Sequence, residues 1–467
     1  MPVETRKSAY TDMSPQWETM RDLADGQRAV HARGTKYLPM LAEQTVQEYE
    51  KFKKRTCFLN ATGKTIDSLV GLVFRKEPTI EKDSSADVFI DDISAAGVSA
   101  YDLSKTALTE LCTVGRYGLL VDYPRNDSGE MTVQEQEASG ARPAVKFYSA
   151  ESIINWKTDT INGKEQLSMV VLLEVVEAKT PSDEFDTNTT EEQYRVLDFE
   201  DGKYRQRLID ADGVETVIDV RKQDKALDFI PFQMFNVSGT GVGVENPPLM
   251  DLAYLNIDHY QKTASHSNAL YVAGASTLVI SGEQATDNEG NSKAFHLGST
   301  TALMLENDTS KAYFVELKGD SIGALSEERN NLKSDMATFG ANLLKEQKKA
   351  AEAAETARIN RAGESSWLAS VASIVSSSIE WALRIALEWQ GLSGDIRFEL
   401  NKDYMPTTMD AQTLTSLINA LQTGAISFDT FWYNLVRGEI APEGMDAETE
   451  QEKIEAGQYS MGDSGVA

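Results

Sequence analysis

The chain has 467 residues, of which 41% are hydrophobic and 25% are charged, a composition typical of a folded protein with a large core. Its formal net charge of −28 argues against a broad basic surface that reads DNA sequence, although a few cations could still contact phosphates. The chain contains neither a long uncharged apolar run nor an apolar signal core near its start, so we expect no membrane span and no Sec export.

Residue patterns that support catalysis or metal binding are scarce. The motifs G-x-S-x-G, C-x-x-C and H-E-x-x-H do not occur, and no carboxylate or cysteine completes a ligand set with His259 and His266. The other histidines are His31 and His296, and all four are interpreted as surface or interface residues. Cys57 and Cys112 are expected to be buried, reduced thiols. We therefore expect no catalytic, cofactor or metal site, and no enzyme.

The first 115 residues predict helices. Apolar residues recur at helical spacing around Trp17, with Ser14 as the expected cap and Pro15 in the first turn. Further helices are expected over about 41–57, 62–74 and 100–114, and a buried strand over 117–123.

From 143 to 237 the apolar period changes to two, which predicts strands. The runs AVKFYS, LSMVVLLEVVEA and YRVLDF belong to this block, with hairpin turns at 200–203 and 212–213. Residues 180–192 are polar and rich in turn formers, so they are expected to form an exposed loop.

After Pro247 the pattern becomes helical again. The expected order is a helix to about Leu270, short strands over 271–318, and a second helix from about Ser321 to Leu343. A long amphipathic helix follows and ends near Leu392, with a kink expected at Gly363. A strand, DIRFEL, and short helices over about 411–422 and 427–436 precede an acidic tail whose end is expected to be disordered.

The string NATGKT at 60–65 resembles part of a phosphate-binding loop. That loop requires glycine at position 58, where this chain has Phe58, and it follows a buried strand, whereas this string lies between two helical segments. A helix start capped by Thr62 is the favoured interpretation. A nucleotide-binding enzyme that uses Asn60–Thr65 stays open as an alternative.

The segment from Leu343 to Arg361 is basic within an acidic chain. It has five cations against three carboxylates, a local charge of +2, and its many alanines offer few anchors to a core. A solvated helix start and a functional loop both remain possible interpretations on the residues alone.

Taken in this order, the elements resemble the portal proteins of tailed bacteriophages, and most closely a subgroup known as a domain of unknown function that includes portals. The resemblance extends over nearly the whole chain. It is carried by GRYGLLVDYP, FYSAESIINW, IPFQMFNV, the helix after Pro247, ETARINRAGESSWLASVA and DIRFELNKDYMP. None of these stretches is a catalytic signature.

The resemblance implies an α+β portal fold with a helical and β wing, a two-helix stem, a small β-rich clip, a long spine helix and a helical crown. The implied divisions are wing 1–246, stem helix 247–270, clip 271–318, second stem helix 319–340, tunnel loop 341–356, spine helix 357–392, and a return strand, crown and disordered acidic tail over 393–467.

The resemblance also implies a function. Such proteins form a ring, usually of twelve subunits, at one capsid vertex of the virion, and assemble in the host cytoplasm. Double-stranded DNA enters and leaves through the ring without being read for sequence. The implied partners are the terminase large subunit, a head–tail adaptor, and the major capsid and scaffold proteins, with no membrane and no cofactor. The implied channel residues are Lys345, Lys348, Lys349 and Arg358. Another virion ring, such as a head–tail adaptor, is the nearest alternative.

Overall fold

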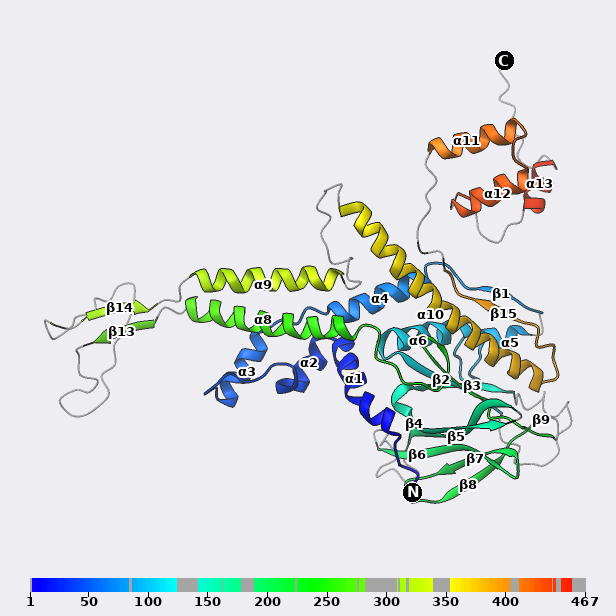
Figure 1. Ribbon diagram of the computed structural model, residues 1–467, viewed down its shortest axis with the longest axis horizontal. Coiled ribbons are helices and arrows are strands. Elements are labelled where there is room, and N and C mark those ends of the chain that lie inside the picture. The colour runs from blue at the N-terminus through cyan, green and yellow to red at the C-terminus, as the bar shows by residue number, and fades with distance from the viewer. Residues whose placement is uncertain are drawn as a thin grey trace, which may run out of the picture. The chain divides into compact units, whose positions relative to one another are not determined.

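The computed structural model describes residues 2–83, 86–123, 142–161, 163–177, 189–222, 225–274, 277–281, 309, 311–315, 319–338, 353–402, 404, 411–438, 440–441 and 447–455. The chain divides into two compact units, residues 1–400 and 401–467, which are described separately. Helices and antiparallel sheets both contribute to the first unit, in agreement with the α+β class expected from the sequence (Figure 1).

Four helices open the chain, and local caps set the start of two of them. The Thr45 hydroxyl accepts from the Glu48 amide while the Glu48 carboxylate accepts from the Thr45 amide, which forms a capping box. Farther on, the Asn60 side chain accepts from the Gly63 amide, so the cap is Asn60 and not the expected Thr62. The helices are α1 Ser8–Asp25, α2 Gln27–Arg33, α3 Val46–Arg55 and α4 Ala61–Val73, with a 3-10 turn at Gly34–Lys36.

The prediction for the start of α1 is wrong. This helix begins at Ser8 rather than after Ser14, so Pro15 lies inside it. The Lys7 amide, just before the helix, donates to the carbonyl of Ile154 at 3.0 Å. This tertiary contact fixes the chain direction upstream of the proline, so the helix starts at Ser8 although Pro15 cannot donate a hydrogen bond within it.

A four-stranded antiparallel sheet forms the core of the first unit, with the strand order β12-β11-β2-β3. Its central strand β2 is buried almost throughout, as expected, and helix α6 leads into it after a cap at Ser99. Gly118 on β2 lies so close to its neighbours that an added Cβ would sit 2.6 Å from the ring of Phe232. The elements are α6 Ala100–Thr113, β2 Arg116–Asp122, β3 Ala144–Ser149, β11 Phe232–Asn236 and β12 Gly239–Thr240.

A second sheet is a five-stranded antiparallel meander whose spatial order follows the chain. The turn between β6 and β7 has positive φ at Asp201 (51°) and Gly202 (74°), as a tight hairpin requires. This turn and the one at Gly213 confirm the sequence prediction. The strands are β4 Ile153–Ile161, β5 Lys164–Glu177, β6 Thr190–Glu200, β7 Lys203–Ile209 and β8 Glu215–Asp219, with a further pair β9 Arg221–Lys222 and β10 Lys225–Ala226.

Two helices that run side by side, α8 and α9, follow the sheets (Figure 1). Between them in the chain lie two short strands that pair antiparallel from Thr277↔Val315 to Ser281↔Lys311. Helix α8 continues four residues past the expected end at Leu270, which places Tyr271 on the helix. The bounds are α8 Met250–Gly274, β13 Thr277–Ser281, β14 Lys311–Val315 and α9 Gly319–Thr338.

Helix α10 spans 37 residues, Ala353–Trp389, which corresponds to about 55 Å. The helix continues through Gly363, and the kink expected there stays a prediction. By length and composition, Trp367–Trp389 could cross a membrane, but half of this segment is buried in the protein, as in a core helix that packs on α6 and β2. The chain then returns as β15 Arg397–Glu399, which pairs with β1 Thr79–Glu81; the short helix α5 covers Asp87–Asp91.

The second unit, as far as it is described, consists of short helices. The Ser427 side chain accepts from the Thr430 amide and caps α12, in which the Phe428 and Trp432 rings stack. Part of the acidic tail, expected to end in disorder, is helical up to Glu455, and residues 456–467 lie outside the described range. The helices are α11 Ala411–Gln422, α12 Phe428–Arg437 and α13 Ala447–Glu455.

The two cysteines differ in exposure, which corrects half of the sequence prediction. Cys112 is buried in α6, where burial raises the pKa of its thiol to about 12. Cys57 is exposed between α3 and α4, because the neighbouring Phe58 is the residue that turns inward and meets the ring of Tyr260 edge-on at 5.6 Å.

Candidate functional site: the paired helices α8 and α9

The helices α8 and α9 are antiparallel. Near one end Leu252 of α8 and Met336 of α9 share a buried cluster, and farther along α8 a guanidinium nitrogen of Arg329 lies 3.4 Å from Nδ1 of His266. Two apolar residues of α9, Leu332 and Met336, are buried. The two helices therefore contact each other through a narrow face along their length. The other faces of each helix are available to other elements of this chain or to other chains.

A buried asparagine fixes the base of this pair to helix α4. Oδ1 of Asn256 accepts from the Thr62 amide at 3.1 Å and from the Thr62 hydroxyl at 3.0 Å. Its Nδ2 donates to the carbonyl of Leu59 at 2.8 Å. Asn256 is fully buried, so these bonds hold α8 in one position on α4, and nothing in the local sequence pattern predicted this.

The histidines of α8 are interface residues, as predicted from the sequence. Burial, together with the nearby cations Arg329 and Lys333, lowers the pKa of His259 to about 4. Burial and Arg329 also lower the pKa of His266. Among the described residues no group of three His, Cys, Asp or Glu side chains is placed to hold a metal ion. His31 meets the Thr56 carbonyl at 3.1 Å, and His296 lies outside the described residues.

The NATGKT string forms the first turn of α4 and has a structural explanation. A Cβ on Gly63 would lie 2.5 Å from the carbonyl oxygen of Ala24, so glycine permits the close approach of α1 and α4. The amides of Thr62 and Gly63 already donate to the side chains of Asn256 and Asn60. Because these donors are occupied, a phosphate would have to displace two buried or half-buried hydrogen bonds. The geometry thus disfavours the nucleotide-binding alternative.

Of the four cations expected to line a channel, only Arg358 lies in an element that the structure describes. Lys345, Lys348 and Lys349 lie outside the described residues. Arg358 belongs to the N-terminal part of α10, which begins at Ala353, inside the segment expected to be a loop. The structure therefore does not test whether these four residues come together.

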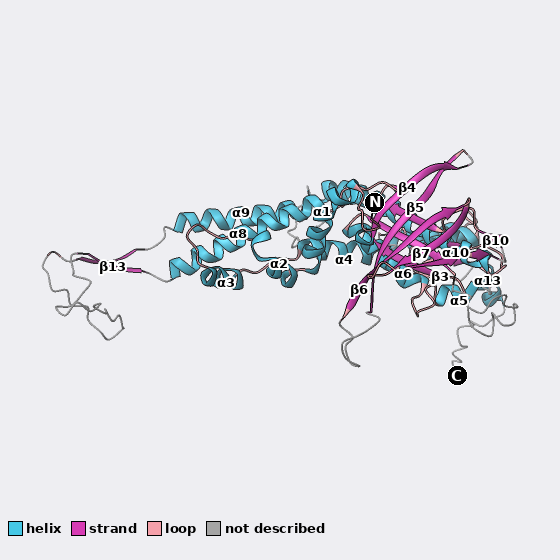
Figure 2. Ribbon diagram, turned by 90° about the horizontal axis from the view of Figure 1, so that it is seen from below, coloured by secondary structure: helices cyan, strands magenta, loops and turns pink. Residues whose placement is uncertain are grey.

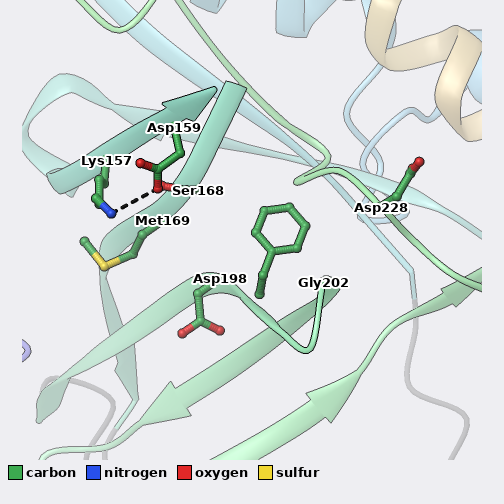
Figure 3. Close-up of a pocket in the computed structure, with 8 residues that line it drawn as sticks. Lys157, Asp159, Ser168, Met169, Asp198, Gly202 and Asp228 are labelled. Atoms are coloured by element: carbon green, nitrogen blue, oxygen red, sulfur yellow. Dashed lines mark hydrogen bonds and ion pairs between the residues drawn. The ribbon is translucent and has the colours of Figure 1, made fainter. Parts of the chain in front are cut away.

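An open pocket of about 510 Å³ lies against the five-stranded sheet (Figure 3). Two of its three acidic groups are already paired, because Asp159 accepts from Lys157 at 3.0 Å, and Asp198 accepts from Arg205 at 2.8 Å and from Arg207 at 2.6 Å. A carboxylate that already forms an ion pair is a poor candidate for acid–base catalysis. The lining residues are Lys157, Asp159, Ser168, Met169, Asp198, Phe199, Gly202 and Asp228.

Residues 248–390 match the model of a protein family described as a domain of unknown function, DUF4055. The match covers less than half of the chain, and it includes α8, both strands of the insert, α9 and all of α10. The family description agrees with the domain-of-unknown-function part of the resemblance noted from the sequence and assigns no activity.

No curated protein sequence matches the chain. Among solved structures, it is similar to a chain in the neck of an empty gene transfer agent particle, with 12% identity and a TM-score of 0.41 over 82% of this chain and 90% of that one. It is also similar to a chain in the virion of a native gene transfer agent particle, with 10% identity and a TM-score of 0.37 over the same shares. Similarity at this level does not assign a function.

Proposed function

We propose that this chain is a portal protein, which forms a homo-oligomeric ring at one capsid vertex and through which double-stranded DNA is packaged and ejected. The proposal begins from the order of elements: two antiparallel helices, a strand pair between them in the chain, and a helix of 37 residues after them. This order agrees with the stem, clip and spine that the sequence resemblance implies. In this proposal the ring has twelve subunits and no enzymatic activity.

The observation that carries the proposal is the set of large apolar side chains left exposed on α8 and on β14 of the insert. Tyr254 is 55% exposed, Tyr271 is 56% exposed, and Tyr313 on β14 is 51% exposed. Leu270 and Val272 at the end of α8 are exposed as well. Apolar groups gathered on one part of a protein favour contact with another chain, and an isolated strand pair has little stability of its own.

The role of the cations before α10 is a separate part of the proposal. In a ring, Lys345, Lys348, Lys349 and Arg358 would line the channel and touch phosphates without reading bases. Weak contacts with few phosphates suit a conduit, because affinity for DNA rises with the number of phosphates neutralised. The acidity of the whole chain, −28, would keep DNA from binding tightly elsewhere.

The test of this part is a triple variant, Lys345→Glu, Lys348→Glu and Lys349→Glu, assembled into particles. We expect normal rings and normal folding, since exposed substitutions change stability by about 0.5 kcal/mol or less. The length of packaged DNA is expected to decrease, because acidic rings would face the cargo. Full-length packaged DNA in particles with normal rings would exclude these lysines from the channel.

Docking to partners follows from the same proposal. The insert with β13 and β14 would bind the terminase large subunit during packaging and a head–tail adaptor afterwards, since its two strands leave edges for pairing with another chain. Contacts with the major capsid and scaffold proteins would hold the ring in the virion. Deletion of residues 284–293 is expected to weaken terminase binding and leave ring formation intact. Unchanged binding would refute the docking assignment.

A head–tail adaptor is the second candidate, because it too is a virion ring. The two candidates differ in where the DNA-packaging motor binds. Capture of the purified terminase large subunit by wild-type rings supports a portal, whereas rings that bind only tail-side proteins support an adaptor.

A further inference from the structure

Helix α8 lies between two other helices. It contacts α9 on one side and α3 on another, and both views show α8 in the middle of the three (Figures 1 and 2). On the α3 side, the Arg55 guanidinium stacks 3.8 Å from the centre of the Tyr271 ring. The outer surfaces of α3 and α9 therefore belong to opposite edges of one layer of helices.

The outer surface of α3 is basic. Tyr49 and Phe52 form its buried face, and the exposed side chains on the other face include Lys51, Lys54 and Arg55. These three positions follow the helical spacing of three and four residues, so they form one stripe. Within the described part of the chain, Lys51 and Lys54 make no ion pair, unlike Lys53, which pairs with Glu50 at 2.9 Å. Glu48, one turn before Lys51, interacts electrostatically with it, so the described residues neutralise the positive charge of the stripe only in part.

The outer surface of α9 is acidic. Leu332 and Met336 are buried against the rest of the first unit, whereas the side chains of Glu327, Glu328 and Asp335 are exposed. Spacings of seven and eight residues place these carboxylates along one stripe of the helix. No ion pair involves any of the three among the described residues, and Arg329 faces the other way, toward His266 of α8. Among the residues that the structure describes, the stripe thus presents carboxylates that form no ion pair.

The basic and acidic stripes lie at similar positions along the axis of α8. Arg55, at the end of the basic stripe, contacts Tyr271. Arg329, next to the acidic pair of α9, contacts His266. Five residues of α8 separate these two levels, which is about 7–8 Å along the helix axis. Because the helices are antiparallel, Glu327 and Glu328 lie even nearer to the level of Arg55.

We propose that α3 of one copy packs against α9 of the next copy, with Lys51, Lys54 and Arg55 facing Glu327, Glu328 and Asp335. This inference rests on the proposed ring and names the two surfaces that close it. A contact between two different faces of identical chains is heterologous, and repetition of such a contact generates a ring when the rotation closes. Complementary charge on the two faces fixes which faces meet and suppresses other pairings.

A second copy of this chain fits the basic stripe better than a nucleic acid does. Three cations would neutralise few phosphates, and the net charge of −28 on the chain would repel the rest of a DNA backbone. The acidic stripe likewise requires a cationic partner of similar length. The chain itself supplies one stripe of each sign, so one repeated contact satisfies both.

The test uses three charge-reversal variants of the full chain and negative-stain images with mass photometry. Variant A carries Lys51→Glu, Lys54→Glu and Arg55→Glu. Variant B carries Glu327→Lys, Glu328→Lys and Asp335→Lys. Variant C carries all six changes and keeps the net charge of the wild type. Exposed ion pairs are individually weak, so the three changes made together in A or in B are expected to lower the ring population roughly tenfold, whereas C forms rings again.

A mixture of variants A and B tests most directly whether the two stripes contact each other. A subunit of A has two acidic stripes and a subunit of B has two basic ones, so A and B alternate around a ring. We expect an equimolar mixture to form rings with an even number of subunits, although neither variant does so alone. Ionic strength raised from about 0.15 M to about 1 M should weaken wild-type rings, since the Debye length decreases from about 8 Å to about 3 Å.

A matched control reverses three exposed cations away from the stripes, Lys105→Glu, Lys164→Glu and Lys203→Glu, and should form rings like the wild type. Rings in A and B at wild-type levels would overturn the interface and leave the proposed function standing. The same conclusion follows if A forms normal rings but loses DNA binding, because α3 would then be a nucleic-acid surface. A wild-type chain that forms no ring under any condition overturns both proposals.

Discussion

Replacement of Asn256 by alanine should loosen the attachment of α8 to α4. The Asn256 side chain is fully buried and makes three hydrogen bonds, two to Thr62 and one to Leu59. Alanine at this position leaves the Thr62 amide, the Thr62 hydroxyl and the Leu59 carbonyl without these partners inside the protein.

The cost follows from what remains unpaired. A buried donor or acceptor left without a partner costs about 1–3 kcal/mol, and the Thr62 hydroxyl can rotate toward another acceptor. Two groups therefore stay unsatisfied, the Thr62 amide and the Leu59 carbonyl, and the free energy of local opening should decrease by roughly 3 kcal/mol. Since 1.4 kcal/mol corresponds to a factor of ten, this decrease speeds hydrogen exchange about a hundredfold.

Hydrogen exchange followed by mass spectrometry on a peptide that covers residues 59–66 measures this change directly. The control is Ser265→Ala on the same helix, which removes one exposed hydroxyl bonded to the Gln261 carbonyl and should change the exchange rate little. A peptide from β6 and β7 should exchange alike in all three proteins. An acceleration below about threefold at residues 59–66 in Asn256→Ala would refute this account of the helix base.

Three further outcomes are expected. Lys64→Ala should change the folding free energy by no more than about 0.5 kcal/mol, because the Lys64 side chain is exposed and its ion pair with Asp67, at 3.7 Å, is exposed as well. We expect no ATP turnover in either protein; turnover that is present in the wild type and lost in the variant would restore the nucleotide-binding alternative. Gly63→Ala should destabilise the chain by about 1–3 kcal/mol in thermal or denaturant unfolding, because its Cβ meets the Ala24 carbonyl, and a variant of wild-type stability would contradict this contact. The pKa of His259 is about 4 in the folded chain and 6.5 in the unfolded chain, so the free energy of unfolding should decrease as the pH falls from 6.5 toward 4. In His259→Gln the free energy of unfolding should depend less on pH in this range, and an unchanged pH dependence would show that other groups cause it.

Local sequence patterns predicted the elements whose ends depend on nearby residues. The helix at 100–114 was predictable because Ser99 caps it and Gly115 ends it with a φ of 79°. The hairpin at 200–203 was predictable because Asp201 and Gly202 tolerate the positive φ that the turn requires. In both cases the physical cause lies within a few residues of the element.

Contacts between distant segments decided the points at which prediction failed. The start of α1 at Ser8 depends on a bond from the Lys7 amide to Ile154, so Pro15 could not mark the first turn. The exposure of Cys57 depends on which of two adjacent side chains turns toward Tyr260. Neither contact leaves a periodic signal in the sequence.

The candidate interface likewise combines a residue spacing that is visible in the sequence with contacts that only the fold creates. The cations of α3 and the carboxylates of α9 are each readable at helical spacing. That α3 and α9 flank the same helix is a consequence of tertiary packing, and only the fold brings Arg55 to Tyr271 and Arg329 to His266. The cations Lys345, Lys348 and Lys349 remain a prediction from the sequence, since they lie outside the described residues.

The central claim is that copies of this chain form a closed ring around a channel. Negative-stain or cryo-electron microscopy of the purified full-length protein, at low and high concentration, tests it most directly. We expect rings of twelve subunits with a central opening, with α3 of each subunit beside α9 of the next. Particles that remain monomers or two-fold dimers at every concentration and ionic strength would contradict it.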